Sequence, residues 1–144
     1  MNRQIKTEIV INASKEKVWN ILTDFPRYSE WNPFIINVEG ELAKGKKLRN
    51  TIRNGEKAMV FKPTVISVVP YRYFDWLGSL FVKGVFDGHH SFEIEELGAN
   101  QVKLIHGETF SGILSGAILK KIGEDTRTNF IRMNQAVKTL AEQS

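Results

Sequence analysis

The sequence predicts an α+β domain in which a curved seven-stranded antiparallel sheet wraps around one long C-terminal helix. Two observations predict this class. Between residues 35 and 110, apolar and polar residues alternate in short runs separated by turn residues, which is typical of consecutive antiparallel strands. After Gly112 the apolar residues instead recur every three or four positions, which indicates one face of a helix. Strands grouped together and flanked by helices indicate α+β rather than α/β architecture.

A strand and two short helices are expected before the alternating block. Residues 5–11 alternate and predict the first strand. Ser14 is suited to cap the helix that follows, and Glu16 lies where the helix dipole favours a negative charge. Pro26 ends that helix because proline lacks an N–H group, and residues 27–30 then predict a second helical turn.

The alternating block predicts six further strands. Asn54–Gly55 is a strong hairpin signal, because these residue types readily adopt the backbone conformation of a two-residue turn. Pro63 cannot donate to a strand ladder, so it predicts a bulge or an edge position. The six strands are expected at residues 36–42, 47–53, 58–69, 72–77, 89–96 and 101–110.

Strand alternation also predicts which side chains face the helix. Phe74 and Trp76 point inward while Tyr73 and Asp75 point outward, and Phe61, Phe81 and Phe86 are expected to join the inward set. In residues 89–96 the inward set is His90, Phe92 and Ile94, and the outward set is His89, Ser91, Glu93 and Glu95. In residues 101–110 one face holds Val102, Leu104, His106, Glu108 and Phe110.

Composition excludes several function classes. The 144 residues contain no cysteine, so disulfides and thiolate chemistry are excluded. The net charge of +4 comes from scattered lysines without a nucleic-acid-binding motif, so no nucleic-acid partner is expected. No segment is apolar enough to predict a transmembrane helix or a signal peptide, and we expect a cytoplasmic protein with one domain over residues 1–144.

Several motifs, in this order along the chain, resemble the polyketide cyclase/dehydrase-type branch of the START-like, or SRPBCC, superfamily. They are Val18-Trp19-Asn20-Ile21-Leu22-Thr23-Asp24, Tyr28, Trp31-Asn32-Pro33-Phe34, Phe61-Lys62-Pro63, Phe74-Asp75-Trp76-Leu77-Gly78, Gly88-His89-His90-Ser91-Phe92, His106-Gly107-Glu108-Thr109-Phe110-Ser111-Gly112, and Phe130, Met133, Asn134 and Ala136 in the terminal helix. The resemblance covers nearly the whole chain.

The resemblance implies a helix-grip fold with a hydrophobic cavity between the sheet and the C-terminal helix. Its members bind lipids, polyketides or other apolar molecules, and a minority catalyse cyclisation or aromatisation. A tightly filled core is the alternative for the same aromatic residues. The residues expected to line the cavity are Trp31, Phe34, Phe61, Phe74, Trp76, Phe86, His90, Phe92, Leu104, His106, Glu108, Phe110, Leu114, Ile118, Ile122 and Phe130.

His90, His106 and Glu108 are the candidate acid–base residues. If residues 97–100 close a hairpin, His90 lies nearly opposite His106, with Glu108 close by on the same face. They could act as acid and base, or anchor the polar end of a ligand. No metal-binding spacing is present, so no metal site and no cofactor are expected.

Three functions follow as hypotheses. The preferred one is binding, or carriage, of a hydrophobic small molecule by a monomer or homodimer. The second is a cyclase, aromatase or dehydratase that uses the cavity histidines and glutamate. The third is a protein-interaction module resembling the Hsp90-activator branch. Residues 31–34 are expected to form either a lid or a packed corner, and residues 111–118 are the preferred gate because glycines alternate with apolar side chains there.

Overall fold

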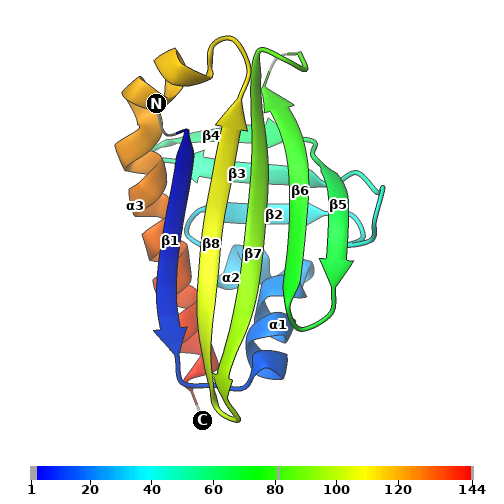
Figure 1. Ribbon diagram of the computed structural model, residues 1–144, viewed down its shortest axis with the longest axis vertical. Coiled ribbons are helices and arrows are strands. Elements are labelled where there is room, and N and C mark those ends of the chain that lie inside the picture. The colour runs from blue at the N-terminus through cyan, green and yellow to red at the C-terminus, as the bar shows by residue number, and fades with distance from the viewer. Residues whose placement is uncertain (1–2, 81, 144) are drawn as a thin grey trace.

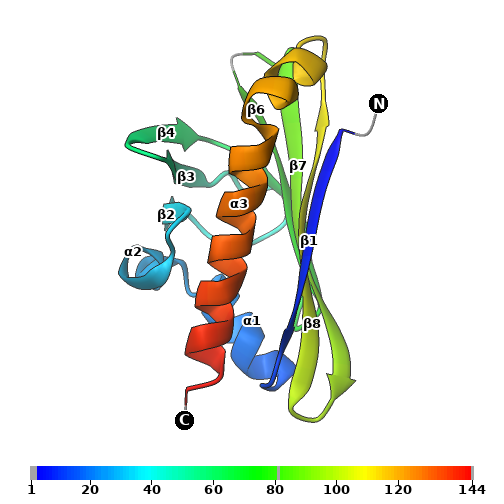
Figure 2. The same cartoon turned by 90° about the vertical axis from the view of Figure 1, so that its left-hand side faces the viewer.

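The computed structural model describes residues 3–80 and 82–143 and confirms the predicted α+β class. A five-stranded antiparallel sheet, in the order β1-β8-β7-β6-β5, forms one layer. A second sheet, β2-β3-β4, lies behind it with strands that run across those of the first (Figure 1). The long helix α3 lies on the same side of the large sheet as the small one (Figure 2).

The strands are β1 (Gln4–Ile11), β2 (Ile35–Glu39), β3 (Arg49–Asn54), β4 (Lys57–Phe61), β5 (Thr64–Val69), β6 (Tyr73–Leu80), β7 (Phe86–Gly98) and β8 (Gln101–Ser111). The helices are α1 (Lys15–Thr23), the 3-10 turn η1 (Phe25–Arg27), α2 (Tyr28–Trp31) and α3 (Ser115–Ala141). Apart from residues 58–69, each element that the sequence predicts is present, with ends that shift by a few residues.

The strand number differs from the prediction at one place. Residues 58–69 form two strands, because Pro63 interrupts the run and the chain passes from the small sheet to the large one. The structure therefore describes eight strands in two sheets instead of seven in one. The Asn54–Gly55 hairpin is confirmed, since it joins the paired strands β3 and β4 with Gly55 at φ +68°.

The N-terminal helices close one end of the space between the sheets. The Ser14 hydroxyl accepts a hydrogen bond from the Lys17 N–H at 3.2 Å, which confirms the predicted cap. Tyr28 is fully buried and its hydroxyl donates to the Leu22 carbonyl. Trp19 of α1 packs edge-on against Phe74 of the large sheet, with ring centroids 5.5 Å apart. This end of the molecule is therefore a filled core.

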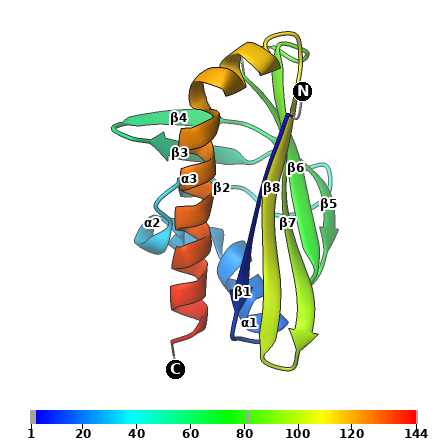
Figure 3. The ribbon, with the colours of Figure 1, turned by 60° about the vertical axis from the view of Figure 1, so that its left-hand side comes forward.

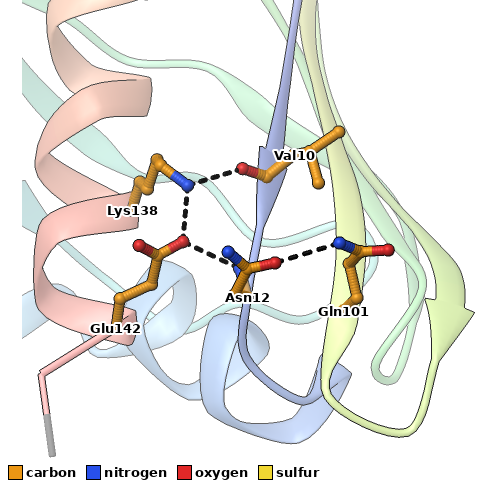
Figure 4. A network of polar contacts seen from close by, with 5 residues as sticks. All are labelled: Val10, Asn12, Gln101, Lys138 and Glu142. Atoms are coloured by element: carbon orange, nitrogen blue, oxygen red, sulfur yellow. Dashed lines mark hydrogen bonds and ion pairs between the residues drawn. The ribbon is translucent and has the colours of Figure 1, made fainter.

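The C-terminal end of α3 is tied to the β1 edge of the sheet, along which the helix runs (Figure 3). Lys138 Nζ donates to the Val10 carbonyl at 2.9 Å and pairs with Glu142 Oε2 at 2.5 Å. Glu142 also accepts from the Asn12 N–H at 2.8 Å, and Asn12 accepts from Gln101 at 3.0 Å (Figure 4). These contacts fix the helix at the point where β1 ends and β8 begins.

The predicted inward and outward faces of the large sheet are confirmed, with one correction. Asp75 faces outward as expected but is only 4% exposed. Its carboxylate accepts hydrogen bonds from the Ser67 N–H and the Tyr73 hydroxyl, and it pairs with His89 Nε2 at 2.5 Å. Neighbouring side chains thus cover this carboxylate on the outer face, and His89, which faces outward as predicted, pairs with it.

Gly112 joins β8 to α3 where two loops meet. Its φ is +106°, and a Cβ there would lie 2.5 Å from the Val85 carbonyl oxygen. The Ile113 and Leu114 N–H groups donate to the carbonyls of Gly84 and Val85, both at 3.0 Å. The absence of a side chain at residue 112 therefore allows the entry to α3 to pack against the β6–β7 loop.

Replacing Gly112 with alanine should destabilise the fold more than replacing Gly55, whose Cβ would meet nothing within 4 Å. Gly55→Ala should cost about 1 kcal/mol from its left-handed backbone alone. Gly112→Ala should cost about 1–3 kcal/mol more, because the backbone must also shift to relieve the overlap. Denaturant unfolding of both variants measures the difference, and equal losses would contradict the close approach.

Candidate functional site

A cavity of about 130 Å³ lies between the two sheets and α3, and no residue of α1 or α2 lines it. Three groups of elements build its wall: β3 and β4 of the small sheet, β6 to β8 of the large sheet, and the first half of α3. Its lining consists of Phe34, Asn50, Ile52, Asn54, Met59, Phe61, Pro63, Trp76, Gly78, Ser79, Phe86, Gly88, His90, Glu108, Phe110, Ile122, Thr126 and Asn129. The wall is mainly aromatic and aliphatic, with a few polar groups.

Half of the predicted cavity residues lie on this wall: Phe34, Phe61, Trp76, Phe86, His90, Glu108, Phe110 and Ile122. They come from inward-facing positions at the cavity end of their strands and from α3. Phe81 lies outside the described residues. The Trp31–Phe34 corner is packed: Asn32 Oδ1 accepts from the N–H groups of Phe34 and Ile35, both at 2.9 Å.

The remaining predicted residues lie off the wall, and five of them belong to the filled core: Phe74, Phe92, Leu104, His106 and Phe130. Phe74 stacks on Phe92 at 5.0 Å, and Phe130 stacks on His106 at 4.1 Å. These residues are off the wall because strand alternation and helix periodicity identify an inward face but not how far along it the core is filled.

Trp31, Leu114 and Ile118 are off the wall for other reasons. Trp31 packs against Tyr28, with ring centroids 5.1 Å apart. Leu114 is 45% exposed in the loop before α3, and Ile118 packs against the core. The segment expected to be the gate thus borders the β6–β7 loop, and neither of its two predicted residues lines the cavity.

Sequence reasoning missed the contribution of the small sheet and the polar residues of α3. Asn50, Ile52 and Asn54 reach the wall from alternate positions of β3, and Asn129 reaches it from α3. The Asn129 amide donates to Asn54 Oδ1 at 3.1 Å across the space between helix and hairpin. The alternation of Asn50, Ile52 and Asn54 along β3 is visible in the sequence. The sequence does not show that β3 belongs to a second sheet that faces the cavity.

The β7–β8 register places Glu108, rather than His106, directly opposite His90. His106 was expected nearly opposite His90 because residues 97–100 were taken as the hairpin loop, whereas β7 continues to Gly98 and β8 begins at Gln101. The two histidines still meet on the diagonal, with their Nε2 atoms 2.8 Å apart. His90 Nδ1 lies 3.4 Å from Glu108 Oε1 on its other side.

Behind the cavity wall, His106 belongs to a buried polar network that the sequence did not reveal. Its Nδ1 lies 2.8 Å from Asn134 Oδ1, and the Asn134 amide donates to the Thr7 hydroxyl at 2.8 Å. The Thr7 hydroxyl donates to the main-chain carbonyl of His106 at 2.8 Å. Burial lowers the pKa of His106 well below its usual value, and the neighbouring His90 adds to this effect. His106 is therefore neutral in the folded protein.

On the outer face, burial and the hydrogen bond to Asp75 raise the pKa of Tyr73 to about 12. Within residues 3–80 and 82–143, no three metal-ligating side chains are grouped so that they could hold an ion. Over the same residues, no helix has the length and apolar character needed to cross a membrane.

The family profile described as "Polyketide cyclase / dehydrase and lipid transport" matches residues 2–142. The chain belongs to this family. The match confirms the resemblance that the sequence motifs indicate, and it covers both sheets, α3 and the cavity between them. A comparison with curated protein sequences finds no match.

Solved structures of low sequence identity share the fold. The Zhui aromatase/cyclase from Streptomyces sp. R1128 is 17% identical with a TM-score of 0.80, and the match covers 97% of this chain and 93% of that one. A START superfamily protein from Mycobacterium smegmatis is 21% identical, with a TM-score of 0.74 and 97% coverage of both chains. Norcoclaurine synthase from Thalictrum flavum, solved with dopamine and hydroxybenzaldehyde, is 15% identical with a TM-score of 0.71, covering 100% of this chain and 90% of that one.

The neutral state of His106 predicts a pH-dependent stability. The unfolded chain binds a proton at this histidine below its ordinary pKa of 6.5, whereas the folded chain does not. The contribution of His106 to stability is therefore complete above pH 6.5 and decreases as the pH falls below it. Between pH 7.5 and 5.5 the wild-type free energy of unfolding should fall by about 1 kcal/mol more than that of His106→Gln. Urea unfolding at both pH values measures this, and equal falls would contradict a neutral His106.

Proposed function

We propose that this protein binds a small aromatic molecule in the cavity between its two sheets and α3. The observation that carries the proposal is the composition of the wall, on which Phe34, Phe61, Trp76, Phe86 and Phe110 surround a hollow of about 130 Å³. Apolar concave sites with a few placed polar groups are the usual small-molecule sites of proteins. Family membership supports the same proposal, because the family description names lipid transport and polyketide chemistry.

The cavity volume restricts the size of the ligand. An apolar protein cavity of about 150 Å³ is large enough to hold benzene. The space of about 130 Å³ is slightly smaller than this, so the ligand part that it suits is no larger than a single aromatic ring. Stacked and edge-to-face contacts with the wall aromatics would then supply the binding energy.

Acid–base catalysis on such a ligand is a second candidate, and one observation favours it. His90 and Glu108 both line the cavity and lie within 3.4 Å of each other, so a bound molecule could touch an imidazole and a carboxyl group at once. His106 is off the wall and fully buried, so any part it takes is through His90.

Binding can be tested with toluene and two tryptophan variants of α3. Ile122 lines the cavity, whereas Ile131 on the same helix is 47% exposed. Toluene should bind the wild type saturably and shift the NMR signals of wall residues. Ile122→Trp should weaken binding at least about tenfold by filling the hollow, while Ile131→Trp should bind as the wild type does. The absence of saturable binding to the wild type, or equal binding by both variants, would refute an open cavity.

A further inference from the structure

The positions of the hydrogens in the buried network of Thr7, His106 and Asn134 follow from one group that can only accept a hydrogen bond. The main-chain carbonyl of His106 carries no proton, so the Thr7 hydroxyl at 2.8 Å must donate to it. The Thr7 oxygen then accepts from the Asn134 amide nitrogen, which turns Asn134 Oδ1 toward His106. An amide oxygen also only accepts, so His106 Nδ1 carries a proton.

The same reasoning applies to the next contacts, which lead from His106 through His90 to Glu108 on the cavity wall. A neutral His106 with a proton on Nδ1 has a bare Nε2, which accepts from His90 Nε2–H at 2.8 Å. His90 then presents Nδ1 to Glu108 Oε1 at 3.4 Å. Oε1 is thus the Glu108 carboxyl oxygen that lies beside His90. The other carboxyl oxygen, Glu108 Oε2, is then the one left to accept a hydrogen bond from a ligand.

Gly88 makes room for this oxygen. A Cβ at residue 88 would lie 2.2 Å from Glu108 Oε2, and both residues line the cavity. The Glu108 side chain is 18% exposed, whereas His90 is 3% exposed, so the carboxyl group is the part of the pair that a ligand can reach. Among the described residues that line the cavity, Glu108 is the one carboxylate.

We propose that Glu108 Oε2 accepts a hydrogen bond from the hydroxyl group of a phenol-type ligand, and that Thr7, Asn134 and His106 are positioning residues for this acceptor. This inference rests on the proposed aromatic binding site and names its ligand class. The other polar groups fit a hydroxylated ring. Asn54 and Asn129 are bonded to each other, and Asn50 adds an amide that is 1% exposed and whose Oδ1 has no hydrogen-bond partner within the described residues.

Phenol and toluene provide the test, because a hydroxyl and a methyl group are similar in size. An apolar cavity without an acceptor disfavours phenol, since the hydroxyl loses its water on entry. The wild type should bind phenol at least as tightly as toluene. Glu108→Met removes the acceptor and should lower the ratio of phenol to toluene affinity at least about tenfold. Glu95→Met, the same change on the exposed face of β7, should leave the ratio unchanged.

Gly88→Ala gives a second variant that retains every titratable group. Its methyl group displaces the Glu108 carboxyl group, so the ratio should fall toward that of Glu108→Met while toluene still binds. Nitrogen-15 NMR of the wild-type histidine rings should show a protonated Nδ1 and a bare Nε2 for His106, and a protonated Nε2 for His90. Asn134→Leu removes the acceptor of His106 Nδ1–H and should alter this pattern.

The outcomes separate the two proposals. If neither phenol nor toluene binds the wild type, the proposed aromatic site is refuted. If toluene binds but the ratio is the same in the wild type, Glu108→Met and Gly88→Ala, the phenol acceptor is refuted while the aromatic site stands. A proton on His106 Nε2 would overturn the positioning roles of Thr7 and Asn134.

Discussion

The buried link between α3 and the large sheet is the constraint on which the cavity depends. Asn134 contacts His106 on β8 and Thr7 on β1, and each of these polar groups is nearly inaccessible to solvent. Buried polar groups that lose a partner are costly, so this link specifies one position of the helix on the sheet. Phe130, one turn earlier on α3, stacks flat on the His106 ring and reinforces the same position.

With the helix held there, the space between the sheets divides into two parts. Toward α1, large side chains such as Trp19, Phe74 and Phe92 fill it completely. Toward the β6–β7 loop, the helix carries the smaller Thr126 and Ile122, the large sheet carries Gly78 and Gly88, and a hollow remains. Filled and hollow regions thus share one continuous inward face, and the pair His90–Glu108 lies at the boundary between them.

The amino-acid sequence predicts most of the fold, because strand alternation, the Asn54–Gly55 turn and the Ser14 cap are local signals that the structure retains. It predicts less of the cavity. Phe92 and Phe110 share the same alternation signal, yet only Phe110 lines the cavity, because the rings of neighbouring strands such as Phe74 and His106 cover Phe92. The tautomers of His90 and His106 depend on Thr7 and Asn134, which are far away in sequence and carry no recognisable motif.

The interruption of the strand run at Pro63 determines where the two sheets are joined by backbone bonds. The backbone bonds that join the small sheet's entry segment to β5 are concentrated at residues 45–48, where Gly45, Lys46 and Leu48 bond to Val65 and Pro63. The β3–β4 hairpin is also bonded through its backbone to β2 and, by the Arg53 N–H, to the Phe34 carbonyl, whereas the Asn54–Asn129 side-chain bond links it to α3. Between the hairpin and α3, the width of the cavity therefore depends on side-chain contacts rather than on a strand ladder.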